Sequence, residues 1–293
     1  MCVGWDMIIA SRLHWAATGL HLAQALVVCG LIVWLDTRNV KAGVFPLHKT
    51  VRVWHADSNA TTTGMIEGVF IESVVVSAGA LDVRYAIASF FALSAAFQGA
   101  AGFLHIIDAT YFRFIEYAFS APTMIMAIAV ETGVDDIYTL QAMFVLVFAT
   151  MVFGIIAELA VARELAWLPH MAGWVTFLSA YSPILDAFIQ SSERSTLVAP
   201  GFVHVIVFLQ FILFACFGAV QAYALFFYFP TQAAGPGEEE PLTEKAGDAD
   251  DFYYNQEDPR HNTTRITMAY VLLSITAKSL LGWLILAPIL TAA

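Results

Sequence analysis

Apolar residues run along the chain in seven long stretches, each with few or no charged side chains. A helix needs about 20 mainly apolar residues to cross the hydrocarbon core of a bilayer. The stretches cover residues 13–35, 85–107, 112–130, 137–162, 166–189, 197–229 and 264–291. This pattern predicts an all-α membrane protein in which residues 1–293 form a single domain of seven transmembrane helices.

The first long connection, residues 36–84, shows a different periodicity. Residues 49–56 partly alternate polar and apolar side chains, and residues 68–77 are rich in β-branched side chains. Both features are typical of strands, and residues 57–64 between them supply a turn. We therefore expect a β-hairpin in this loop.

The second long connection, residues 230–262, carries nine acidic side chains against Lys245 and Arg260. Glycine and proline recur through it. A segment of this kind buries too little apolar surface to offset the entropy lost on ordering. We expect an acidic, disordered and solvated loop, with a docking role as the alternative.

Composition and charge agree with a protein that lies mostly in lipid. The chain is 59% hydrophobic and only 13% charged, whereas soluble domains carry roughly 25% charged residues. Its net charge of −11 leaves no basic patch for phosphates, which argues against nucleic-acid binding. Residues 1–11 lack a basic stretch followed by a short apolar core, so we expect no cleavable signal peptide.

Two ionisable residues inside the apolar stretches, Lys278 and Glu116, need an explanation, because placing a charge at mid-bilayer costs at least about 2.5–3.5 kcal/mol. Lys278 lies close to the middle of the last stretch. A buried lysine can lose its proton, pair with an acid, or form a Schiff base with an aldehyde. Glu116, near the start of the third stretch, is the best counterion. Ser120 follows it by one turn, and Arg113 precedes it by one turn, where an ion pair at spacing three is possible.

Charge and position alone leave simpler interpretations open. Lys278 and Glu116 could form a structural ion pair, or Lys278 could extend its ammonium group to the interface, which its mid-span position disfavours. His14, His21 and Gln24 lie close to one face of the first helix, where histidines are more often hydrogen-bond partners than metal ligands. Phe211, Phe214 and Phe217 recur at spacing three, as in ordinary core packing or along the flank of a polyene.

Two motifs carry a resemblance to a known family. Residues 269–283 read AYVLLSITAKSLLGW around Lys278, and residues 116–120 read EYAFS. Together they resemble the microbial-type rhodopsins and, more closely, the heliorhodopsin branch. The stretches HLAQ at 21–24, LSAAFQ at 93–98, PGFV at 200–203 and AVQ at 219–221 support that branch. The resemblance spans nearly all seven helices and ends in the acidic loop.

The resemblance implies all-trans-retinal bound to Lys278, with Glu116 as the only carboxylate counterion and Ser274 close to the Schiff base. The retinal site is then expected to include Tyr117, Ser120, Met124, Phe211 and Phe214, together with a polar network of His21, Gln24 and Gln98. The family often has a second histidine where this chain has Gln98. Glutamine does not titrate near neutral pH, which puts a histidine pair as proton acceptor in doubt.

The resemblance to the rhodopsins also argues against a light-driven pump. Pumps of the wider superfamily have an aspartate where this chain has Ser274, and a donor carboxylate where it has Ala127. We therefore expect a light sensor that is not an enzyme and that shifts between two states after isomerisation. A light-activated proton transporter or channel is the alternative, with Glu131, Asp186, Glu193 and His204 as possible path residues.

Two further classes remain as alternatives. An animal-type G-protein-coupled receptor is disfavoured because the Asn-Pro-x-x-Tyr run expected in the last helix is absent around Pro288. A membrane enzyme or metal transporter would have to use the histidines.

Orientation cannot be decided from charge, because six Lys and Arg residues fall on each side of the seven-span topology. The resemblance implies a cytoplasmic N-terminus and an extracellular C-terminus, which would make Asn59, and not Asn262, the usable glycosylation site. It also implies a homodimer in the lipid bilayer and a cytoplasmic signalling partner of unknown identity.

Overall fold

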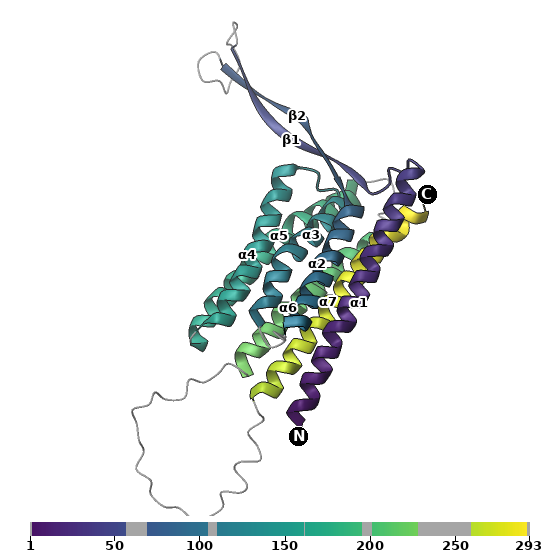
Figure 1. Cartoon of the computed structure of the whole chain (residues 1–293). Coiled ribbons are helices and arrows are strands. Elements are labelled where there is room, and N and C mark those ends of the chain that lie inside the picture. Colours follow the sequence, from purple (N-terminus) through teal and green to yellow (C-terminus); the bar gives the residue numbers. More distant parts are fainter. Residues whose placement is uncertain are drawn as a thin grey trace, which may run out of the picture.

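A computed structural model describes residues 2–56, 69–104, 110–160, 162–194, 201–227 and 259–291. Within these ranges the chain forms seven helices and one two-stranded sheet (Figure 1). The elements are α1 (Cys2–Thr37), β1 (Val44–Ala56), β2 (Val69–Asp82), α2 (Val83–Leu104), α3 (Thr110–Glu131), α4 (Ile137–Leu159), α5 (Arg163–Arg194), α6 (Gly201–Phe227) and α7 (Pro259–Thr291).

The predicted all-α membrane fold with seven spans is confirmed, since each of the seven helices is long and apolar enough to cross a membrane. Several helices extend beyond their apolar stretches. α1 begins at Cys2 instead of residue 13, and α7 begins at Pro259, inside the predicted acidic loop. Proline is well tolerated in the first helical turn, where its missing N–H would have no partner. The rest of the predicted loop, residues 230–258, lies outside the described residues.

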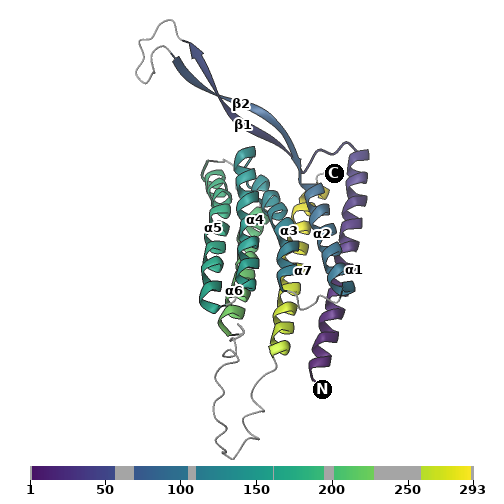
Figure 2. The ribbon, with the colours of Figure 1, turned by 60° about the vertical axis from the view of Figure 1, so that its left-hand side comes forward.

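The helices run alternately up and down, so that α1 begins at one end of the bundle and α7 ends at the other (Figures 1 and 2). α3 is the most buried of the seven spans and contacts α2, α4, α5, α6 and α7. α7 packs against α1, α2, α3 and α6. Side chains that α3 and α7 direct inward therefore meet in the middle of the molecule.

Close packing of α7 on α2 depends on a glycine. A Cβ atom at Gly282 would lie 2.7 Å from the ring of Phe91, which is fully buried. Interiors packed at this density cannot absorb even one extra methyl group without movement. Gly282 thus lets α7 approach α2 closely at a point one turn after Lys278.

The predicted β-hairpin is also confirmed, and it projects from the end of the bundle at which α7 ends (Figure 2). Its strands are antiparallel and longer than predicted, with Val44 opposite Asp82 and Ala56 opposite Val69. The register shifts between Leu47 and His48. The predicted turn, residues 57–64, lies outside the described part of the chain.

Two contacts fix the base of the hairpin to the bundle. The His48 backbone N–H donates at 2.9 Å to the carbonyl oxygen of Asp135, which lies in the connection between α3 and α4. Arg84, at the start of α2, is buried and pairs with Asp82 at 2.6 Å and with Asp36 at 3.1 Å. Arg84 thus joins the ends of α1 and β2 to α2 and has carboxylate partners for its charge.

Candidate functional site

Lys278 and Glu116 meet in the interior of the bundle. Lys278 is 3% exposed and Glu116 is 2% exposed, and the Lys278 ammonium forms an ion pair with Glu116 Oε1. Lys278 Nζ also donates to Ser274 Oγ at 3.0 Å, one turn earlier on α7. It lies 5.1 Å from the ring centroid of Tyr117, within cation–π range. Lys278 therefore does not extend to the interface, and the alternative of a snorkelling lysine is wrong.

Glu116 accepts two further hydrogen bonds, both from α2. Ser94 Oγ donates to Oε1 at 2.7 Å, and Gln98 Nε2 donates to Oε2 at 3.2 Å. A carboxylate only accepts when it is ionised, so these three donors fit a negatively charged Glu116. The motif LSAAFQ contained both donors, but its spacing did not show that Ser94 would reach the carboxylate.

Arg113 does not pair with Glu116, although spacing three made such a pair possible. Its Nη1 donates to Thr267 Oγ1 at 2.8 Å, and its guanidinium lies 4.7 Å from the Tyr270 ring centroid. The Arg113 side chain is thus directed to α7, where both of these contacts lie. Arg113 lies in the first turn of α3, which begins at Thr110.

The predicted network of His21, Gln24 and Gln98 divides into two separate groups. His14 Nδ1 lies 2.6 Å from Gln98 Oε1, so His14 is joined through Gln98 to Glu116. His21 Nδ1 instead lies 3.2 Å from Gln24 Oε1, and Gln24 Nε2 donates to Ser279 Oγ at 2.9 Å. The histidine linked to the candidate counterion is thus His14, two turns before the one that the resemblance indicated.

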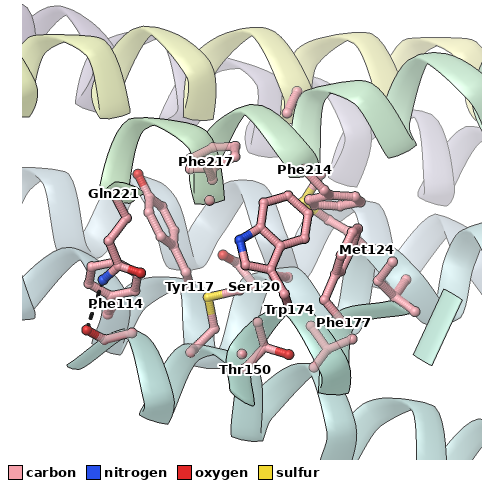
Figure 3. A pocket seen from close by; sticks show the side chains of 18 of the residues that line it. Phe114, Tyr117, Ser120, Met124, Thr150, Trp174, Phe177, Phe214, Phe217 and Gln221 are labelled. Carbon is pink, nitrogen blue, oxygen red and sulfur yellow. Dashed lines mark hydrogen bonds between the residues drawn. The ribbon is translucent and has the colours of Figure 1, made fainter. Parts of the chain in front are cut away.

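A cavity opens beside Lys278, between α3, α4, α5, α6 and α7 (Figure 3). Of the residues expected around a chromophore, Tyr117, Ser120, Met124, Phe214 and Ser274 line it. Phe211 does not line it and instead stacks on Phe177, with ring centroids 5.8 Å apart. Phe217, which shares the spacing of Phe211 and Phe214, also lines it. Sequence reasoning missed several other lining residues, among them Phe114, Thr150, Trp174, Phe177, Gly218 and Gln221.

Trp174 forms a fixed wall of this cavity (Figure 3). Its indole Nε1 donates to His170 Nε2 at 3.1 Å, and His170 Nδ1 lies 3.0 Å from Gln221 Oε1. Gly218 makes room for the indole, since a Cβ atom there would lie 2.6 Å from Trp174 Cζ2. Sequence analysis missed Trp174 because an aromatic residue in an apolar stretch gives no signal of the direction in which it points.

The cavity has the chemistry that an elongated apolar aldehyde requires. Its walls are mainly aromatic and aliphatic, and a primary amine, Lys278, stands on its lining beside a carboxylate. The Ser120 hydroxyl is buried on the lining without a hydrogen-bond partner among the described residues. These residues fit retinal. By contrast, no group of three or more His, Cys, Asp or Glu in the described ranges could hold a metal ion.

Comparison with known proteins gives a family match and a distant structural likeness. The heliorhodopsin family model matches residues 11–228. A solved structure of the light-driven proton pump LR (Mac) from Leptosphaeria maculans is 11% identical, with a TM-score of 0.48, covering 98% of this chain and 94% of that chain. A likeness this low carries no inference about function. No curated protein matches the chain.

Proposed function

The chain belongs to the heliorhodopsin family of retinal-binding rhodopsins, and we propose that it is a light sensor with retinal on Lys278 and Glu116 as counterion. The observation that carries this proposal is the buried Lys278–Glu116 pair on the lining of an aromatic cavity. A structural ion pair alone would not need an adjoining cavity. The protein is a multi-pass membrane protein, and lipid surrounds its seven spans.

Bound retinal, proposed here in its all-trans form, supplies visible absorption and a light-driven change of shape. The Lys278 nitrogen stays protonated because Glu116 lies beside it and offsets the cost of burying a cation. Ser94 and Gln98 hold the Glu116 carboxylate in place. Ser274 Oγ accepts a hydrogen bond from the same nitrogen, and the Tyr117 ring lies within cation–π range of it.

The proposed role is signalling rather than pumping or enzymatic catalysis. A pump needs an acid that reprotonates the lysine nitrogen from the far side. Ala127, which occupies the usual donor position, is fully buried in the apolar core. Asp186 and Glu193 lie at exposed positions of α5. Recovery after light should therefore be slow, and a long-lived altered state suits a sensor.

One observation favours a light-activated proton transporter as the second candidate. His14, Gln98, Glu116 and Lys278 form a continuous line of polar contacts from α1 to α7. Gln98 Nε2 donates to Glu116, so Gln98 Oε1 accepts from His14 Nδ1–H. Neutral His14 then presents its other ring nitrogen, Nε2, as a buried proton acceptor, and this atom has no partner among the described residues.

Voltage clamp on cells that express the full chain separates the two candidates. A sensor should give no sustained photocurrent, while a light-minus-dark absorption difference persists in the same membranes. Lys278→Ala is the matched control without the proposed attachment site. A sustained current in the parent that disappears in Lys278→Ala would contradict the sensor and establish the transporter.

We also propose the orientation and assembly that the family implies. The N-terminus faces the cytoplasm, the hairpin and the C-terminus face outward, and two chains form a homodimer. The start of α1, the end of α6 and the start of α7 lie at the same end of the bundle (Figure 2). A signalling partner would then meet the protein at that cytoplasmic end.

A further inference from the structure

Arg113 is a buried cation whose hydrogen-bond donors are mostly unused. Its side chain is 4% exposed, and its hydrogen bond in the described structure is the one from Nη1 to Thr267 Oγ1 at 2.8 Å. Its Nε and Nη2 atoms are buried and have no partner among the described residues. The hydroxyl of Tyr270, whose ring lies against the guanidinium, is buried and unpartnered as well.

The charge of Arg113 also lacks a carboxylate partner, unlike the other buried cations of the described ranges. Lys278 pairs with Glu116, and Arg84 pairs with Asp82 and Asp36. Glu158, at the end of α4, accepts from Gln221 at 3.3 Å and forms no ion pair with Arg113 in the described structure. An uncompensated buried charge is strongly destabilising.

The two side chains that contact Arg113 in the described structure, Thr267 and Tyr270, are both able to donate. The guanidinium carries donors and no acceptor, and the hydroxyls of Thr267 and Tyr270 can each donate one proton. Thr267 and Tyr270 stand three residues apart on α7, so both lie on the side that faces Arg113. The Tyr270 ring compensates part of the charge through its π face. The ring provides no hydrogen-bond acceptor for Arg113 Nε and Nη2.

We propose that Arg113, Thr267 and Tyr270 form a binding site for a small inorganic anion such as chloride. The anion accepts from the free guanidinium nitrogens and from the Tyr270 hydroxyl, and it neutralises the buried charge. This site is separate from the Lys278–Glu116 pair but adjoins it. Arg113 stands one turn before Glu116, and the Tyr117 hydroxyl donates to the Tyr270 carbonyl oxygen at 3.3 Å.

The test is thermal unfolding of the purified full-length protein, reconstituted with retinal and followed by tryptophan fluorescence. Sodium chloride is compared with sodium gluconate at equal ionic strength. Chloride should raise the unfolding midpoint by about 2–4 °C, because a ligand that binds only the folded state stabilises it. An equal midpoint in the two salts would overturn the proposal and assign the free donors to water.

Variants locate the effect. Tyr270→Phe keeps the ring and removes the hydroxyl, so the chloride effect should shrink to less than half. Arg113→Gln should abolish it. Arg84→Gln is the matched control, because it removes a buried arginine that already has carboxylate partners, and it should keep the full effect. An undiminished chloride effect in both Tyr270→Phe and Arg113→Gln would place the anion elsewhere and overturn the site.

The readout does not depend on the proposed chromophore. A protein that unfolds cooperatively but shows no visible colour would refute the retinal site and leave the anion comparison valid. A coloured protein with identical midpoints in chloride and gluconate would refute the anion site and leave the proposed function intact.

Discussion

Glu116 is the residue that balances the buried charge of Lys278. It accepts from Ser94 and Gln98 on α2 and from Lys278 on α7. Three donors hold one carboxylate between three helices, and one of them is a cation that has no other acid among the described residues. The charge state of the Lys278 nitrogen should therefore depend on Glu116 more than on any other side chain.

Glu116→Gln tests this dependence. A neutral amide cannot offset a buried cation, so the retinal-loaded variant should lose most of its protonated, visible-absorbing form at neutral pH. Absorption spectra between pH 5 and pH 9 measure the loss. Ser94→Ala is the control, because it removes one hydrogen bond and no charge. An unchanged visible band in Glu116→Gln would mean that Glu116 is not the counterion.

His14 is the second residue-scale test. Its Nδ1 lies 2.6 Å from Gln98 Oε1, and loss of a buried hydrogen-bond partner costs about 1–3 kcal/mol. His14→Leu should lower the free energy of unfolding by that amount and shift the visible band, because Gln98 is a partner of Glu116. His21→Leu should leave the band in place. The reverse ranking would show that the network of His21, Gln24 and Gln98, as the resemblance implied, is the one that acts on the chromophore.

Lys278 and Glu116 could be predicted because a charge within an apolar stretch is costly and therefore stands out. His14 and Arg113 could not be assigned their partners in this way. His14 and His21 share one face of α1, and only the position of α2 decides which of them reaches Gln98. Arg113 meets Thr267 on α7, which is 154 positions away in the sequence.

At the scale of elements, hydropathy located all seven helices but not their ends. It marks the part of a helix that crosses lipid, whereas hydrogen bonding carries α1 back to Cys2 and α7 back to Pro259. The hairpin shows the same limit. Its strands continue through Pro46 and Gly79, two residues that depress strand propensity, because backbone pairing on a two-stranded ribbon tolerates them.

The contact between α5 and α6 provides a prediction at this scale. Gly218→Ala places a Cβ atom 2.6 Å from Trp174, so the indole must move, at a cost of about 1–3 kcal/mol. The variant should take up less retinal, measured as visible absorbance per protein after reconstitution. Gly173→Ala is the matched control on the same cavity, because its nearest atom would be 3.6 Å away. Equal uptake by both variants would show that the Trp174 wall does not shape the binding site.

At the scale of the whole molecule, the bundle joins a buried charge pair, an aromatic cavity and an extended hairpin in one chain. The hairpin stands at the end where α7 finishes, opposite the end where α7 begins (Figure 1). Sequence patterning predicted the seven helices and the hairpin, and the resemblance implied the charge pair. The heliorhodopsin family match agrees with that resemblance. Patterning could not predict the cavity wall, because the packing of α3 to α7 depends on which side of each apolar helix faces inward.

The most direct test is an absorption spectrum of the full-length protein supplied with all-trans-retinal, recorded beside Lys278→Ala. Tryptophan fluorescence and membrane extraction establish that both proteins are folded and inserted. A visible band in the parent that is absent from Lys278→Ala is the expected result, since the amine is the attachment point and Glu116 keeps its nitrogen charged. If neither folded protein shows a visible band, the chromophore proposal is wrong, and Lys278 and Glu116 are a structural ion pair.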